Sequence, residues 1–180
     1  MIVEETFLKG CLIIKPAVFK DDRGYFFESF NLKKFKKETG VSVNFVQDNQ
    51  SKSVKGVLRG LHFQKTPHAQ AKLVRVIQGK VLDVVVDLRR ESPTFGQHFK
   101  IVLDDKEHVQ LLIPKGFAHG FLVLSDKAIF SYKCDDFYNK ESEQGIIYND
   151  PDLNIDWDFP AQELLLSDKD LKLPRLKDIL

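Results

Sequence analysis

The sequence has few cysteines, no excess of either charge and no long apolar run. Its two cysteines, Cys11 and Cys134, are too few for a disulfide framework, and their spacing matches no zinc motif. We interpret both as buried apolar residues. The small disulfide-rich and zinc-finger classes are therefore excluded.

Charge is balanced, with 27 Lys and Arg against 26 Asp and Glu and a net charge of +1. Such a balance gives no electrostatic reason to expect a nucleic-acid or membrane-surface partner. An anionic small ligand remains compatible with it, because a few local Arg and Lys residues are enough to bind one. We therefore predict no nucleic acid and no membrane as partners.

Apolar stretches are short throughout. The run Cys11 to Ile14 is far too short for a signal sequence, and the residues before it include no basic start region. No stretch approaches the length of a membrane span. The expected location is the cytoplasm.

What the chain does contain suits one globular domain. It has 180 residues, of which 43% are hydrophobic, enough for a full core. No internal repeat, low-complexity run or linker divides it. We expect a single domain over residues 1–180.

Alternation of apolar and polar residues predicts strands. Residues 81–88 place Leu82, Val84 and Val86 on one face and Asp83 and Asp87 on the other. Strand patterns also cover residues 72–79, 99–103, 109–113, 120–124 and 129–134. Short strands at this spacing indicate an all-β sandwich or barrel.

Helix is scarce. Residues 31–40 begin with a capping Asn31, place Leu32 and Phe35 on one side and end at Gly40, which predicts one short helix. The proline-containing C-terminal third is predicted to be irregular, with a short helix near residues 162–166.

One motif indicates the type of β fold. Residues 113–119 contain a Pro-x-Gly-x-x-His pattern in which Gly116 permits a tight turn and His119 begins a new strand. The pattern resembles the second motif of the cupin superfamily. That resemblance implies a cupin-type jelly roll, also called a double-stranded β-helix.

The metal ligands of the first cupin motif are not matched. Counting back from Gly79, Thr66 and His68 take the positions of the two usual His ligands, and Lys72 takes that of the Glu. An ammonium repels a cation, and His68 with His119 supplies too few donors for a first-row metal. We predict no metal. Lys72 either stays solvated at a strand end or binds a developing enolate oxygen.

An ordered series of segments gives more information than any one of them. His62 by itself is compatible with a satisfied core histidine. It lies, however, in a chain that carries the segments 23–28 (RGYFFE), 45–51 (FVQDNQS), 56–64 (GVLRGLHFQ), 117–121 (FAHGF), 132–135 (YKCD), 148–153 (YNDPDL), 155–157 (IDW) and 166–170 (LSDKD). From about Phe7 to Asp170 this series resembles the dTDP-4-dehydrorhamnose 3,5-epimerase family.

The resemblance implies roles for individual residues. His62 resembles the catalytic base, Asp170 the carboxylate that orients it, Tyr132 the acid on the opposite face, and Lys72 the residue beside the C4 oxygen. The further substrate-binding positions that it implies are Arg23, Glu28, Gln47, Asn49, Arg59, His119, Glu143 and Lys169.

The resemblance also implies a substrate, no cofactor and a partner. The substrate would be dTDP-4-dehydro-6-deoxy-D-glucose, whose inversion at C3 and C5 is a proton transfer without redox chemistry. Family members are homodimers that exchange N-terminal strands, so Arg23 or Glu28 could enter the site of the partner chain.

Each role has a simpler alternative. Tyr132 could pack beside Phe130, Asp170 could cap a helix or turn, and Arg59 could be ordinary surface charge. Strict alternation also places Arg59 and His62 on opposite faces. Either a bulge at Gly60 resets the alternation, or Arg59 reaches around from an edge.

Three other functions are compatible with parts of the pattern. The same His62 and Tyr132 would serve an epimerase acting at C3 only or at C5 only. A metal-dependent cupin enzyme and a non-catalytic nucleotide-sugar binding protein are less well supported.

Overall fold

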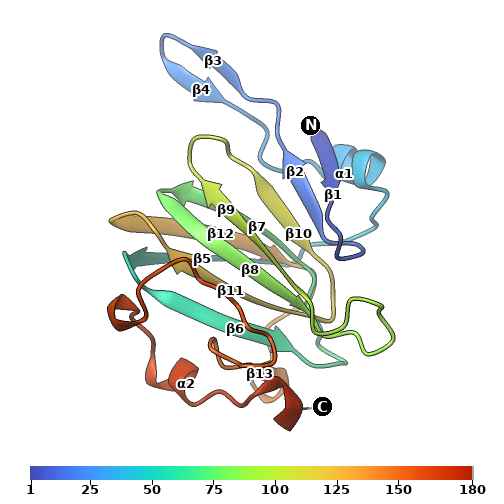
Figure 1. The fold of residues 1–180 in the computed structure, drawn as a ribbon. Helices are drawn as coiled ribbons and strands as arrows, with labels where there is room; N and C mark the ends of the chain where they lie inside the picture. The colour runs from blue at the N-terminus through green and yellow to red at the C-terminus, as the bar shows by residue number, and fades with distance from the viewer. Residues whose placement is uncertain (180) are drawn as a thin grey trace.

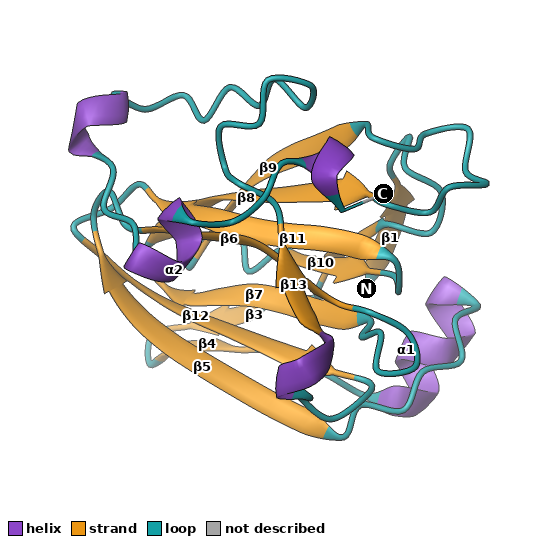
Figure 2. Ribbon diagram, turned by 90° about the horizontal axis from the view of Figure 1, so that it is seen from below, coloured by secondary structure: helices purple, strands orange, loops and turns teal. Residues whose placement is uncertain are grey.

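The computed structural model describes residues 1–179, and its body consists of two β-sheets stacked face to face (Figures 1 and 2). The larger sheet has six strands, in the spatial order β1 (Ile2–Glu5), β2 (Leu12–Lys15), β10 (Gln110–Ile113), β7 (Lys72–Gln78), β12 (Lys127–Cys134) and β5 (Gln47–Val54). The smaller has five, in the order β13 (Glu143–Gly145), β6 (Leu58–Gln64), β11 (Phe117–Val123), β8 (Lys80–Asp87) and β9 (His98–Asp104). This arrangement is the cupin-like jelly roll.

Alternation along β8 shows how the sequence builds the layers. Val81 and Val85 belong to the apolar core between the two sheets, and Leu82 and Val84 pack on the outer face of the smaller sheet. Asp83 shares the inward face with Val81 and Val85, because side chains alternate along a strand. A carboxylate therefore points into the space between the sheets.

The C-terminal segment covers the outer face of the smaller sheet (Figure 2). Its apolar side chains Ile146, Leu153, Trp157 and Leu176 join the outer residues of that sheet in one buried cluster. The segment carries η2 (Ala161–Glu163), α2 (Asp168–Leu171) and η3 (Leu176–Asp178), and η1 (Lys140–Ser142) precedes it. Its packing brings α2 beside β6.

The helix α1 (Leu32–Thr39) has the predicted ends. The Asn31 side chain accepts a hydrogen bond from the Lys34 N–H, and Gly40 ends the helix at a φ of 70°. Phe35 is buried against the outer face of the larger sheet. Leu32 remains 49% exposed, so only one of the two apolar residues predicted on that side of the helix is buried.

A two-stranded arm projects from the body (Figure 1). It consists of β3 (Phe19–Asp21) and β4 (Gly24–Phe26), and Phe19 and Phe26 are 66% and 72% exposed. Large exposed aromatic side chains on a projecting hairpin are typical of a surface that another chain covers.

The predicted strands are confirmed, with changes at their ends. The last motif strand begins at Phe117 rather than at His119, so that histidine lies inside β11. The helix predicted near residues 162–166 is the shorter η2, and α2 was not predicted. Within the described chain, no helix is long and apolar enough to span a membrane. Cys11 and Cys134 are free thiols and both are buried, as predicted.

Candidate active site

A cavity of about 420 Å³ opens between the two sheets. Strands of both sheets and the helix α2 contribute to its wall. Most of the predicted site residues line it, namely Asn49, Arg59, His62, Lys72, His119, Tyr132, Glu143, Lys169 and Asp170. The fold thus brings together positions that are more than a hundred residues apart in the chain.

His62 is held by a carboxylate from the C-terminal segment. Its Nε2 lies 2.7 Å from Asp170 Oδ1, and the buried Nδ1 has no hydrogen-bond partner among residues 1–179. Ser167 caps α2 and donates a 2.8 Å hydrogen bond to the other Asp170 oxygen. Burial raises the pKa of Asp170, but the hydrogen bonds from His62 and Ser167 outweigh it and leave this pKa below its usual value.

A bulge in β6 places Arg59 and His62 on the same face. His62 pairs with His119 and Arg59 pairs with Phe121, so β6 has one residue more than β11 between the two pairs. Gly60 lies in this bulge at a φ of 130°, and a Cβ there would come within 2.5 Å of the Gly120 Cα. Only glycine tolerates both conditions. The bulge, one of the two predicted alternatives, is confirmed.

Arg59 adds a positive charge to the cavity wall. The Arg59 Nε donates a 3.2 Å hydrogen bond to the Ser53 hydroxyl on β5. This bond links the two sheets and fixes the guanidinium on the cavity wall.

Tyr132 and Lys72 enter from the larger sheet, opposite His62. They lie on the neighbouring strands β12 and β7, with the Lys72 Nζ 5.8 Å from the centre of the Tyr132 ring. Burial raises the pKa of Tyr132, so its phenol keeps its proton at neutral pH. Burial lowers the pKa of Lys72. Within the described chain the Lys72 ammonium forms no hydrogen bond, so it is free to bind a substrate oxygen.

A second His–Asp pair lies on the same sheet as His62. The His119 Nε2 lies 2.9 Å from Asp83 Oδ2, and both side chains are buried. The His119 ring also stacks on Phe130. Asp83 was not predicted as a site residue.

Polar residues at the mouth form a connected group. Glu143 accepts from the Lys169 Nζ at 2.6 Å and from the Tyr138 hydroxyl at 2.9 Å. Gln47 does not line the cavity, but its amide nitrogen donates to Asn49 Oδ1 and its carbonyl oxygen accepts from the Tyr138 N–H. These contacts join β5, β13 and α2 around the opening.

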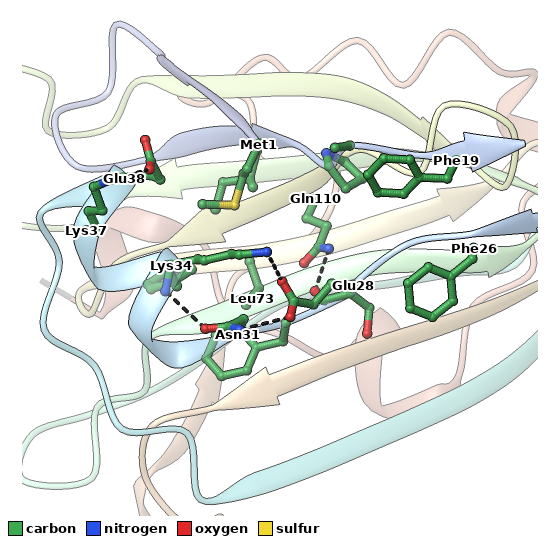
Figure 3. A pocket seen from close by; sticks show the side chains of 16 residues that line it. Met1, Phe19, Phe26, Glu28, Asn31, Lys34, Lys37, Glu38, Leu73 and Gln110 are labelled. Atoms are coloured by element: carbon green, nitrogen blue, oxygen red, sulfur yellow. Dashed lines mark hydrogen bonds and ion pairs between the residues drawn. The ribbon is translucent and has the colours of Figure 1, made fainter.

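Two predicted residues lie away from the cavity of their own chain. Figure 3 shows Glu28 beside α1, where it accepts hydrogen bonds from Lys34 at 2.7 Å and Asn31 at 2.9 Å. Arg23 lies at the tip of the β3–β4 arm and pairs with Asp21 at 2.6 Å. The position of the arm could not be predicted from the sequence, because its direction depends on contacts outside the hairpin.

The wall also holds residues that the sequence analysis missed. Gln50, Ser51 and Ser167 line the cavity, and Asp83 supports His119 from behind. Two signals were present: Ser167 stands three residues before Asp170, as a helix cap does, and Asp83 is an inward charge in an apolar strand.

No cluster of three His, Cys, Asp or Glu side chains suited to a metal ion occurs among residues 1–179. His119 is engaged by Asp83, and His68 lies in the loop before β7. The jelly roll and a polar cavity with a proton acceptor and a proton donor on opposite sheets define a cupin-type isomerase. Comparisons with known proteins identify the family.

The family model described as dTDP-4-dehydrorhamnose 3,5-epimerase matches residues 5–178. A protein of that name from Shigella flexneri is 53% identical over 99% of this chain and 97% of its own length. The crystal structure of the enzyme of that name from Elizabethkingia anophelis is 56% identical, with a TM-score of 0.94 over 98% of this chain and 96% of its own. A Legionella pneumophila dTDP-6-deoxy-D-glucose-3,5-epimerase, in complex with dTDP-4-keto-L-rhamnose, has a TM-score of 0.95 and is 48% identical, covering 99% of this chain and 94% of its own.

The chain belongs to the dTDP-4-dehydrorhamnose 3,5-epimerase family. It is therefore an isomerase of the 3,5-epimerase type, as the ordered series of segments predicts.

Proposed function

We propose that the protein inverts C3 and C5 of dTDP-4-dehydro-6-deoxy-D-glucose, giving dTDP-4-dehydro-L-rhamnose for dTDP-L-rhamnose biosynthesis. The observation that carries this proposal is the placement of His62 and Tyr132 on different sheets across one cavity. Inversion requires a base and an acid on opposite sides of the sugar ring, because a single group tends to return the proton to the face that it left.

His62 takes the proton. The C4 ketone of the substrate acidifies the hydrogens on C3 and C5, and the His62 imidazole on the cavity wall removes one of them. The Asp170 carboxylate fixes the ring and stabilises the imidazolium that forms. The C–H electron pair moves into an enolate.

Lys72 and Tyr132 complete the inversion. The negative charge of the enolate develops on the C4 oxygen, where the Lys72 ammonium stabilises it. The Tyr132 phenol then gives its proton to the opposite face of the same carbon. Proton exchange with solvent restores both groups, and the cycle repeats at the second carbon. Electrons and protons balance without a redox cofactor.

The remaining polar residues bind the nucleotide and sugar. Arg59 and His119 line the wall beside His62, and we assign them to the diphosphate and sugar. Gln47, Asn49, Glu143 and Lys169 surround the mouth, and we assign them to the nucleotide.

The active form is a homodimer in which the partner supplies the arm. Arg23 and Glu28 lie away from the cavity of their own chain, whereas the arm projects with exposed aromatic residues. Exchange of N-terminal strands would bring these residues to the partner's cavity. Residues 1–180 form one domain, and the two free cysteines fit a reducing, cytoplasmic location.

The test is incubation with the 4-keto sugar nucleotide in heavy water, followed by NMR. Deuterium should enter at both C3 and C5, and the product should have both centres inverted. Exchange at one carbon only would show a single-centre epimerase, and binding without exchange would show a non-catalytic protein.

A further inference from the structure

Asp83 is a buried carboxylate that the proposed proton transfers do not use. It lies on β8 with a side chain that is 0% exposed, and the neighbouring inward positions of that strand are valines. An ionised group in such a place is costly unless other groups compensate it. Because an apolar residue would serve the core better, a reason connected with the cavity is indicated.

Asp83 contacts one of the predicted binding residues. Its Oδ2 lies 2.9 Å from the His119 Nε2, and its Oδ1 has no hydrogen-bond partner in the described part of the chain. A ring nitrogen that faces a carboxylate carries a hydrogen. The contact therefore fixes which His119 nitrogen is protonated and how the ring stands on Phe130.

Asp83 also acts through space on Lys72. Burial lowers the pKa of Lys72, and the negative charges that oppose this come from Cys134, Asp83 and Glu143. Burial raises the pKa of the Cys134 thiol to about 11, so this group is uncharged near neutral pH. Glu143 is already paired with Lys169. Among these three groups, Asp83 is therefore the carboxyl group that has no lysine partner in the described chain.

We propose that Asp83 is a positioning residue of the cavity, which holds His119 by its Nε2 on the wall beside His62 and places a buried carboxylate on the inner face of the sheet opposite Lys72. The proposal rests on the proposed function, because it requires Lys72 to bind the C4 oxygen. Asp83 acts only through these two residues and does not touch the reacting atoms.

The test is Asp83→Asn, which removes the charge and keeps the size. We expect kcat to fall roughly tenfold or more, as for other supporting contacts, with a smaller change in KM. Tyr132 on β12 lies beside the Lys72 Nζ, and the charges that act on Lys72 through space come from Cys134 on β12, Glu143 on β13 and Asp83 on β8. Without the carboxylate, Lys72 should lose its proton at a lower pH. In a plot of kcat against pH, the fall on the alkaline side should therefore move to lower pH.

Asp87→Asn is the matched control. Asp87 lies on the same strand with a 0% exposed side chain, but its partners are Arg89, Ser92 and Thr94. Its replacement should lower the midpoint of thermal unfolding. The pH at which kcat of the folded enzyme falls on the alkaline side should not change. The proposal would be overturned if kcat fell at the same alkaline pH in Asp83→Asn and the wild type. It would also be overturned if this pH shifted equally in Asp83→Asn and Asp87→Asn.

A second measurement does not depend on the folding of a variant. In the wild-type protein labelled with ¹⁵N-histidine, the His119 signal, assigned by its loss in His119→Gln, should show a protonated Nε2. A bare Nε2 would overturn the proposal even if the enzyme epimerises normally. An inactive wild-type enzyme with a protonated Nε2 would instead refute the proposed function alone.

Discussion

At the residue scale, the proposed mechanism depends on one imidazole. His62→Asn removes the base and keeps a polar side chain of similar reach. We expect turnover to fall by at least about a hundredfold, which is the contribution of a positioned general base, and deuterium exchange at C3 and C5 to fall with it. His68→Asn is the control, because His68 lies in the loop before β7. Equal losses in the two variants would favour a metal-dependent cupin enzyme.

Tyr132 is expected to affect the second half of the inversion. Tyr132→Phe keeps the ring on β12 and removes the proton donor. Net inversion should slow, while His62 continues to exchange some hydrogen at the first carbon. Tyr148→Phe, in the apolar cluster under the C-terminal segment, should change neither rate. Unchanged inversion in Tyr132→Phe would assign the acid to another group.

The positions of residues in the cavity were predictable only where a motif fixed them. His62, Asp170 and Tyr132 belong to segments with a recognisable order, and the structure brings all three to one cavity. Asp83 had no such segment, and its contact with a cavity residue appears only when β11 places His119 beside it. Long-range pairing of this kind depends on strand order, which local alternation does not determine.

At the element scale, the bulge in β6 decides which side chains share the cavity. Gly60→Ala places a Cβ against the Gly120 backbone and strains a residue with φ of 130°. We expect a loss of about 2–4 kcal/mol in the free energy of unfolding, from strain and overpacking together, and a loss of activity as Arg59 and His62 separate. Urea unfolding and kcat measure both.

Gly24→Ala is the control that separates backbone strain from the close contact between β6 and β11. Gly24 has a φ of 129°, but a Cβ there would meet nothing within 4 Å. Its replacement should cost only the strain, about 1–2 kcal/mol. If the two alanine variants lost the same stability, close contact between β6 and β11 would not be the reason for glycine at position 60.

Strands were the elements that the sequence predicted best, because alternation with a period of two survives in β7, β8 and β12. The short helix α2 escaped prediction, since four residues are too few for a helical period to appear. Its position depends on the burial of Trp157 and Leu176 on the smaller sheet, a tertiary effect.

At the scale of the whole molecule, a half-buried ion pair between Asp87 and Arg89 connects the end of β8 to the following loop. Burial raises the pKa of Asp87, but hydrogen bonds from Arg89, Ser92 and Thr94 lower it further, so it lies well below its usual value. A lowered pKa stabilises the folded state above pH ~4, the ordinary Asp pKa. That stability is lost as the pH falls through the folded-state pKa.

Asp87→Asn should therefore reduce stability at neutral pH by up to about 3 kcal/mol, the lower end for a broken buried pair, because Arg89 is 32% exposed. The variant and the wild type should converge in stability as the solution is acidified below pH ~4. Thermal unfolding at several pH values measures both effects. A constant difference at all pH values would show that the carboxylate charge is not the cause.

The C-terminal segment supplies one part of the site and the two sheets supply the others. Lys72 and Tyr132 lie on strands of the larger sheet and His62 on the smaller, whereas the carboxylate that contacts the imidazole lies in α2. A single proteolytic cut between β13 and α2 would therefore leave Asp170 held beside His62 only by noncovalent packing, and activity should fall as the cleaved segment dissociates.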